Sequence, residues 1–218
     1  MKIICLANSR KHGLHCVAGL APPQGQWIRP ISSRPDGALP RESILVEGRE
    51  PRLLDVIDVP LSPAPAADFG FQPENRLLDG AAWRSERSIQ PFEMFQFCRP
   101  HEHLLHNDGD RVPFSWLKTL PAGERRSLQL VHVWDAAFHQ KTSAKGKPHV
   151  KAAFTYTGSS GRQTRYELVV TDPAIEKLVL DGEGVRRHCL LTVSLGMPYS
   201  PDGREEDCYK LVAGVVEI

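Results

Sequence analysis

The sequence predicts a mainly β protein with short helices. Three observations support this fold class. In several segments apolar residues recur at every second position, which is the period of a strand with one buried face. Turns rich in Gly, Ser and Pro separate these segments. The chain has 218 residues, of which 41% are apolar, and this is enough for one large or two small domains with buried cores.

The C-terminal part, from residue 127, begins with three predicted strands. In the first, Leu128 to Phe138, alternation places six residues on one face: Leu128, Leu130, His132, Trp134, Ala136 and Phe138. The second starts at His149, and its buried positions are Val150, Ala152, Phe154 and Tyr156. The third follows a turn with two glycines, a residue that reaches positive φ at little steric cost, and it buries Tyr166, Leu168 and Val170.

A short helix is predicted after the third strand. Asp172 is suited to the N-cap and Pro173 to the first helical position. Two further strands follow at 188–196 and 208–218. Strand, strand, strand, helix, strand, strand is the order of an OB-fold, a small Greek-key barrel that binds oligonucleotides or oligosaccharides. Other five-stranded barrels and α+β folds remain alternatives.

The N-terminal half also begins with strands, although its pattern is less regular. They are predicted at 2–7, 15–20 and 26–31. A short helix is predicted at 41–46 and a strand at 53–61. The region 62–126 is rich in Pro and Arg and predicts an irregular wrap, with short helices near 101–106 and 113–120.

Composition narrows the function classes. The 27 Lys and Arg nearly balance the 26 Asp and Glu, so any nucleic-acid or membrane contact must come from local charge. No apolar run approaches the roughly 18 to 20 residues of a membrane span, and the N-terminal apolar stretch is too short for a signal peptide. Five cysteines without a CxxC pair fit reduced thiols. We therefore expect a cytoplasmic protein with no membrane partner.

Seven phrases, spread over the whole chain, together resemble a bacterial family. They are ANSRK at 7–11, CVAG at 16–19, WIRPIS at 27–32, LLDVIDVPL at 53–61, FQPENRLLD at 71–79, LTVSLGMPY at 191–199 and YKLVAG at 209–214. With them the chain resembles the dual OB-containing domain family.

This resemblance implies two OB-like Greek-key barrels. The first is expected in residues 1–126, with the irregular Pro- and Arg-rich region as its extension, and the second in residues 127–218. The resemblance also implies nucleic-acid binding, in bacterial nucleic-acid processing or defence. It supplies no catalytic residues.

The clearest local charge lies in residues 139–165, which contain several basic residues and no acidic one. On an OB barrel, 139–148 is the loop between the first two strands, one of two loops that grip a single strand. The residues predicted to contact phosphates are Lys141, Lys145, Lys147, Lys151 and Arg162. A solvated basic loop without a ligand is the alternative interpretation.

The other gripping loop, near 197–207, contains Tyr199 as a candidate for base stacking. Its acidic residues would repel phosphate, and they suggest a protein partner for this loop. They are Asp202, Glu205, Glu206 and Asp207.

Polar residues of the first half form a further candidate site. The turn after the first strand is expected at the mouth of a barrel, where it would bind an anionic group. It carries Asn8, Ser9, Arg10 and Lys11. The alternative is a hairpin turn with no ligand.

Two further phrases, at 27–32 and 71–79, add candidates. Alternation places Trp27 and Arg29 on one strand face, where a ring and a guanidinium can hold a base and a phosphate. Otherwise Trp27 is core and Arg29 pairs with a carboxylate, Asp55 or Asp58. In the phrase at 71–79, Gln72 and Asn75 can read base edges or brace the two halves.

Metal and catalytic signals are weak. Cys98, His101, His103 and His106 resemble half of a zinc site, but no second knuckle follows, which favours surface histidines. The sequence has no nucleophile, phosphate-loop or metalloprotease motif, so we predict no cofactor, metal or catalytic residue.

Three functions remain open. The first is a non-catalytic module for single-stranded or unusual nucleic acid. The second is an enzyme acting on nucleic acid or a nucleotide, which requires polar residues such as Ser9, Arg29 and Glu74 to converge in one pocket. The third is a protein-interaction module.

Overall fold

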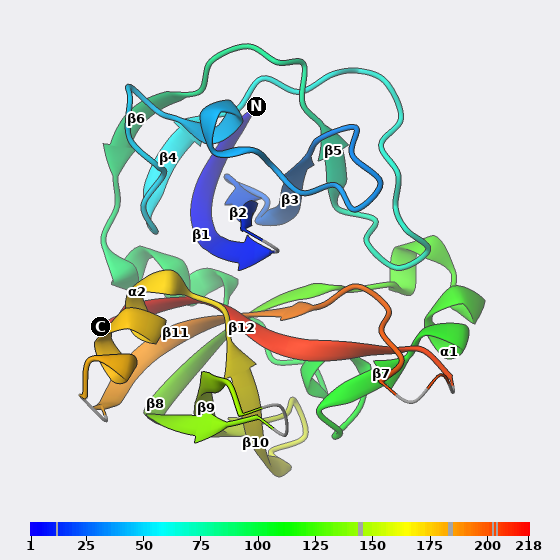
Figure 1. The fold of residues 1–218 in the computed structure, drawn as a ribbon, viewed down its shortest axis with the longest axis vertical. Coiled ribbons are helices and arrows are strands. Elements are labelled where there is room, and N and C mark those ends of the chain that lie inside the picture. Colours follow the sequence, from blue (N-terminus) through cyan, green and yellow to red (C-terminus); the bar gives the residue numbers. More distant parts are fainter. Residues whose placement is uncertain (12, 144–145, 183–184, 202, 204) are drawn as a thin grey trace.

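The computed structural model describes the chain except residues 12, 144–145, 183–184, 202 and 204. The described residues form two six-stranded sheets, which lie one above the other in Figure 1. Strands β1 to β6 make the upper sheet and β7 to β12 the lower one. The protein is thus mainly β with short helices, as predicted.

The second barrel has the topology expected of an OB-fold. Its elements are β8 (Leu128–Thr142), β9 (Pro148–Thr157), β10 (Gln163–Val170), α2 (Pro173–Leu180), β11 (Val185–Leu195) and β12 (Asp207–Glu217). The sheet order is β10-β9-β8-β11-β12, and a parallel pairing of β10 with β12 closes the barrel. Asp172 caps α2 through the backbone N–H groups of Ala174 and Ile175. The predicted order of strands and helix is confirmed.

The first strand of this barrel differs from the prediction of a single face for 128–138. Opposite β11, the residues Trp134 and Asp135 of β8 together face His188, which is a β-bulge. Because the extra residue reverses the alternation, Ala136 and Phe138 point into the barrel core, whereas Trp134 is exposed. The predicted shared face of Trp134 and Phe138 is therefore wrong.

The first barrel repeats this plan in a shorter form. Its elements are β1 (Lys2–Lys11), β2 (Leu14–Ala21), β3 (Gln26–Ile31), the 3₁₀ helix η1 (Arg41–Ile44), β4 (Asp55–Asp58), β5 (Asn75–Leu77) and β6 (Arg84–Ser88). In the second barrel, β12 pairs antiparallel with β11 and parallel with β10. Here two short strands divide these roles, since β6 pairs antiparallel with β4 and β5 pairs parallel with β3.

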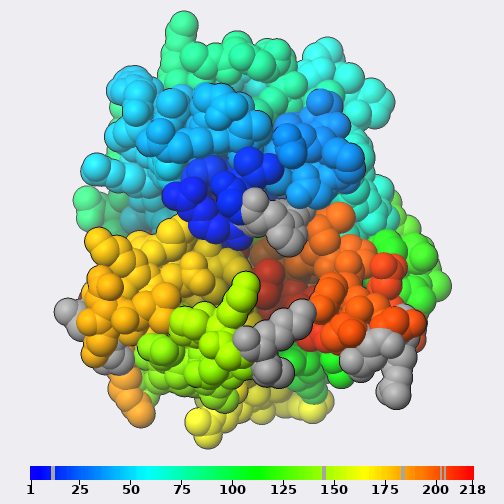
Figure 2. Space-filling model, viewed as in Figure 1, coloured from blue at the N-terminus to red at the C-terminus, as the bar shows by residue number. Residues whose placement is uncertain are grey.

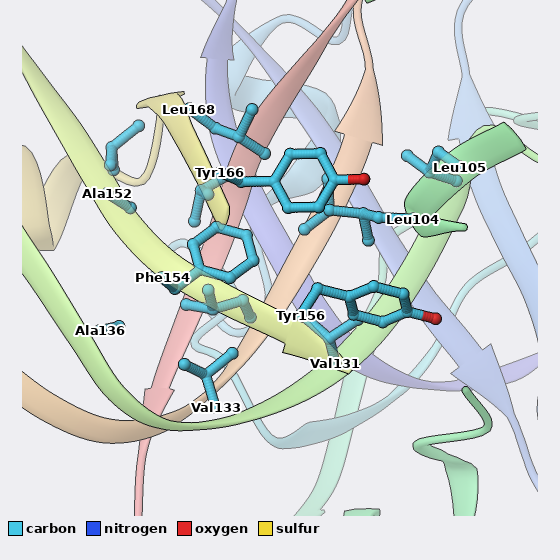
Figure 3. Close-up of a cluster of buried hydrophobic side chains, with 14 of the residues drawn as sticks. Leu104, Leu105, Val131, Val133, Ala136, Ala152, Phe154, Tyr156, Tyr166 and Leu168 are labelled. Carbon is cyan, nitrogen blue, oxygen red and sulfur yellow. The ribbon is translucent and has the colours of Figure 1, made fainter. Parts of the chain in front are cut away.

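The irregular region contains η2 (Pro91–Phe97), η3 (Leu104–His106), β7 (Arg111–Pro113), α1 (Phe114–Thr119) and η4 (Ala122–Glu124). Short helices were predicted near η3 and α1, and both are present. Strand β7 pairs with β12 of the second barrel. In Figure 3, Leu104 and Leu105 of η3 lie beside Tyr156 and Tyr166 in that barrel's core. The division of the chain at residue 126 stays a prediction. The pairing of β7 with β12 crosses this boundary, because β7 precedes residue 126 in the sequence.

The two barrels touch through a common apolar interface. One cluster joins six residues of the first barrel and its extension to three of the second: Ile4, Leu6, Leu20, Val56, Ile89 and Met94 with Leu130, Leu190 and Val216. Strand β12 also lies directly against β1, because a Cβ added at Gly214 would overlap the carbonyl oxygen of Leu6. The relative position of the barrels is therefore set by close packing.

Among the described residues, no helix has the length and apolar character needed to cross a membrane.

Candidate functional site

A cavity of about 480 Å³ opens between the two barrels. Figure 2 shows it as a hollow below the blue β1–β2 hairpin, beside the orange segment that precedes β12, with dark red β12 at its base. Its volume lies within the usual range of small-ligand sites. Its lining includes Ser9, Arg10, Arg29 and Gln72 from the first half, and Thr171, Ser194, Tyr199 and Tyr209 from the second. The cavity therefore gathers five of the residues singled out in the sequence.

A hydrogen-bonded chain holds Arg10 at the mouth of this cavity. Arg10 Nη1 lies 3.0 Å from His15 Nε2, and His15 Nδ1 lies 2.8 Å from Asn8 Oδ1. Because arginine only donates, His15 accepts at Nε2 and donates from Nδ1 to Asn8. Burial and the charge of Arg10 lower the pKa of His15, so the ring is neutral at pH 7. Asn8 therefore positions Arg10 through His15.

Arg10 keeps much of its charge available. Arg10 Nη2 lies 3.7 Å from Glu50 Oε2, which is a long ion pair, and 45% of the Arg10 side chain is exposed. Ser9 is buried beside it, and its hydroxyl donates to the carbonyl of Cys16 at 3.5 Å. The side chain of Lys11 lies outside the described residues.

Arg29 forms the floor of the cavity and is 3% exposed. Its Nη2 lies 3.1 Å from Glu74 Oε1 and donates to Ser127 Oγ at 3.0 Å and Ser194 Oγ at 3.3 Å. The hydroxyl of Ser127 donates to the same Glu74 carboxylate. Arg29 is thus neutralised by a carboxylate, and the pair links the first half to Ser127, which directly precedes β8, and to Ser194 of β11.

The partner of Arg29 is not one of the two carboxylates considered from the sequence. Asp55 lies 2.7 Å from Arg49, and Asp58 lies 2.9 Å from the N-terminal ammonium group. Both carboxyl pKa values are lowered, and Asp58 owes its shift first to that hydrogen bond. The expectation of Asp55 or Asp58 is corrected, because β4 carries these side chains away from β3 and toward other cations.

Gln72, Asn75 and Trp27 take different positions. Asn75 is buried and donates to the carbonyl of Ala67 at 2.8 Å and to Gln72 Oε1 at 3.1 Å, so it braces the chain at Gln72. Gln72 lines the cavity. Trp27 packs against Leu128 and lines a separate hollow of about 340 Å³.

The basic segment 139–165 is partly neutralised. Lys141 Nζ lies 2.7 Å from Glu167, and Lys151 Nζ lies 4.0 Å from the same carboxylate. The hydrogen bond from Lys141 is the first cause of the lowered pKa of Glu167. Arg162 pairs with Asp108. Lys147 is exposed, and Lys145 lies outside the described residues.

The segment between β11 and β12 places Tyr199 at the cavity, where it is 54% exposed. Its ring centroid lies 6.5 Å from that of Tyr209. Two acidic residues in this segment and at the start of β12 contact other parts of the chain. Glu205 accepts a hydrogen bond from Ser115, and Asp207 lies 3.3 Å from Arg111 Nε. Asp202 lies outside the described residues.

The cysteine and histidines considered for zinc have other partners. His103 Nδ1 lies 2.8 Å from Asp108, and His106 Nε2 lies 2.8 Å from the carbonyl of Arg126. Burial lowers the pKa of His106 to about 4 and raises that of Cys98 to about 11. In the part of the chain that the structure describes, no three His, Cys, Asp or Glu side chains are grouped to hold a metal ion.

Sequence reasoning missed Ser127, Ser194 and Tyr209. Ser127 and Ser194 contact Arg29, which lies about a hundred or more residues earlier in the chain. Tyr209 stands in the phrase YKLVAG, which contributed to the family resemblance, and that phrase was the available signal. The contacts themselves follow only from the docking of the barrels.

Comparison with known proteins identifies one family. The model of the dual OB-containing domain matches residues 1–215, nearly the whole chain. No curated protein matches the chain, and no solved structure does.

Proposed function

Since the chain belongs to the dual OB-containing domain family, we propose that it binds single-stranded nucleic acid in the cavity between its two barrels. One observation carries the proposal. The cavity is lined by the β1–β2 hairpin of the first barrel and by the β11–β12 connection of the second. These correspond to the two loops with which OB barrels hold oligonucleotides. Each barrel contributes one of them to a shared site.

The chemistry of the lining fits this ligand. Arg10, which His15 holds in place, can pair with a phosphate. Tyr199 presents an exposed ring on which a base can stack. Lys147 lies on the β8–β9 hairpin, which borders the hollow in Figure 2. It can therefore contact a further phosphate of the bound nucleic acid. The neutral Arg29 and Glu74 pair supports the floor.

A non-catalytic role is part of the proposal. Ser9, Arg10 and Arg29 do line one cavity, as an enzyme would require. However, the Ser9 hydroxyl donates to a backbone carbonyl, and Glu74 is occupied by Arg29 and Ser127. Among the described residues of this cavity, no hydroxyl or thiol contacts a general base. Two of the acidic residues near Tyr199, Glu205 and Asp207, contact Ser115 and Arg111 within the chain, which weakens the protein-interaction alternative.

All five cysteines are free, as expected in a reducing compartment. We propose that the protein acts in the bacterial cytoplasm, in nucleic-acid processing or defence, and the free thiols are compatible with that compartment.

Oligonucleotide titrations test the proposal. The wild-type chain is titrated against a labelled oligo(dT) of about twelve residues, and the matching oligo(rU), at about 50 mM and about 200 mM salt. We expect binding at low salt that weakens steeply as salt rises. Arg10→Glu should weaken it at least roughly tenfold, and Tyr199→Ala roughly five- to 150-fold, because each removes one class of contact.

Arg84→Glu is the matched control. Arg84 is an exposed residue of β6, so this substitution makes the same change in charge at a place away from the cavity. Equal weakening by Arg10→Glu and Arg84→Glu would show a nonspecific charge effect and contradict the site. Absence of binding to either oligonucleotide at low salt would refute the function.

A further inference from the structure

Four aromatic rings form a cluster on the outer surface of the second barrel and on η2, in which Trp134, His188 and His132 contact one another and His132 also contacts Phe95. Trp134 and His188 are stacked, with centroids 4.3 Å apart and an interplanar angle of 11°. His188 lies 4.9 Å from His132, and His132 stacks on Phe95 at 4.9 Å. Trp134 is 74% exposed, more than any other large hydrophobic residue that the structure describes. Since His188 covers one face of the indole, the opposite face is open to solvent.

The bulge in β8 builds this arrangement. Trp134 and Asp135 lie opposite the single residue His188, so the indole is turned outward and laid against the imidazole. His132 Nε2 and His188 Nε2 lie 2.6 Å apart, so one ring donates a hydrogen bond and the other accepts it. The cluster is therefore held in place by contacts within the sheet, and the open face of the Trp134 indole is fixed in its position.

A hollow of about 450 Å³ adjoins the cluster. Trp134, His132 and Arg99 line it together with polar residues of β9 and β10, among them Thr155 and Gln163. Arg99 is exposed and forms no ion pair with any residue that the structure describes. The carboxylate in the described lining, Asp135, is already paired with Arg186 at 2.6 Å. The hollow thus combines an open aromatic face with an unpaired guanidinium.

A second hollow continues from the first. The two share Arg99 and Leu130, and the second is lined by Trp27, Arg125 and Arg126. Together the two hollows form one path lined by aromatic rings and arginines, of which Arg125 is paired with Asp68 at 3.4 Å. Single-stranded nucleic acid is recognised by this combination, because bases stack on rings while cations follow the backbone.

We propose that this path is a second contact for single-stranded nucleic acid, in which a base stacks on the open face of Trp134 and a backbone phosphate pairs with Arg99. The ligand class rests on the proposed function, but the site is separate from the cavity between the barrels. The polar side chains beside the rings, and the unpaired Arg99, favour a base and its phosphate over an apolar protein surface.

An abasic oligomer separates stacking from charge. Wild type and Trp134→Ala are titrated with oligo(dT) of about twelve residues and with an abasic oligomer of the same length and charge. We expect Trp134→Ala to weaken oligo(dT) binding roughly five- to 150-fold, with abasic binding and the salt slope unchanged. Trp134→Phe should largely restore the affinity, and Arg99→Gln should lower the salt slope by about one phosphate contact.

Trp116→Ala is the control, because Trp116 is also an exposed tryptophan, at 43%, but lies on α1 outside this path. If Trp134→Ala binds oligo(dT) like wild type while Arg10→Glu does not, the second contact is overturned and the proposed function stands. If Trp134→Ala weakens the binding of oligo(dT) and of the abasic oligomer equally, the stacking of a base on Trp134 is overturned. If the wild type binds neither oligomer, both proposals fail.

Discussion

At the scale of single residues, Lys210 on β12 is a cation enclosed in the protein. It is 1% exposed, and its Nζ donates to the carbonyl and the side-chain oxygen of Asn107 at 2.6 and 2.9 Å. It also lies 5.0 Å from the Tyr166 ring. Burial lowers its pKa to about 7, against the opposing influence of Asp108 and Asp110. At this pKa the proton of Lys210 is lost near neutral pH.

This lowered pKa predicts a rise in stability above neutral pH. The unfolded chain keeps the Lys210 proton until about pH 10.5, whereas the folded chain loses it near pH 7. The unfolded state therefore binds more protons in between, and the free energy of unfolding increases with pH. Between about pH 7 and about pH 8.5 the gain is on the order of 1 to 2 kcal/mol, measured by urea unfolding.

The variant Lys210→Met removes the titrating group and should show a flat profile over the same interval. The buried cysteines have raised pKa values and matter only above about pH 9, where they oppose the trend. An equal slope in wild type and Lys210→Met would assign the effect to another group.

At the scale of elements, the contact of β1 with β12 fixes how the barrels meet. Gly214 lies where a side chain would overlap the Leu6 carbonyl, so the two backbones approach as closely as glycine allows. The neighbouring residues Ala7, Ala18 and Ala213 are also small. Small side chains on both strands thus permit the close docking on which the shared cavity depends.

Gly214→Ala is expected to force the barrels apart. The free energy of unfolding should fall by at least about 1 to 3 kcal/mol, the usual cost of overpacking, and oligo(dT) binding in the cavity should weaken with it. Gly123→Ala serves as the control, because a Cβ at Gly123 meets no atom within 4 Å, and its effect should stay within about 0.5 kcal/mol. Equal stability of both variants would show that β1 and β12 can separate without cost.

At the scale of the whole molecule, the barrels share an apolar cluster and a buried polar network. Arg29 and Glu74 come from the first half, whereas Ser127 and Ser194 come from the second barrel. Removing one member of a buried ion pair leaves an uncompensated charge, which costs more than losing the pair together. Because the apolar cluster and the network around Arg29 both include residues of the two halves, the halves should unfold as one unit.

Urea unfolding followed by circular dichroism and by tryptophan fluorescence tests this coupling. We expect one coincident transition. Glu74→Leu should lower the free energy of unfolding by about 3 to 5 kcal/mol, and the double variant Arg29→Met with Glu74→Leu should recover part of this loss. Two separate transitions would show that the network does not join the barrels. A double variant as unstable as the sum of the two single variants would show that Arg29 and Glu74 are not coupled.

The sequence by itself determined the strands, the turns and the order of the second barrel. Period-two alternation and helix caps act over a few residues, so they are readable without knowledge of distant partners. The strands β1 to β3 and the helices η1, η3 and α1 followed from the same local patterns, whereas η2 and η4 were not predicted. The divided fifth strand of the first barrel did not, because β5 is three residues long and too short to show a period.

Only the tertiary structure decided which charges stay available and which aromatic rings meet. Lys141 is neutralised by Glu167 and Arg162 by Asp108, although the segment 139–165 contains no acid. Trp134 meets His188 because one extra residue in β8 reverses the face of the strand. Pairing between distant elements depends on register and docking, and a shift of one residue changes every partner, so local patterns do not specify it.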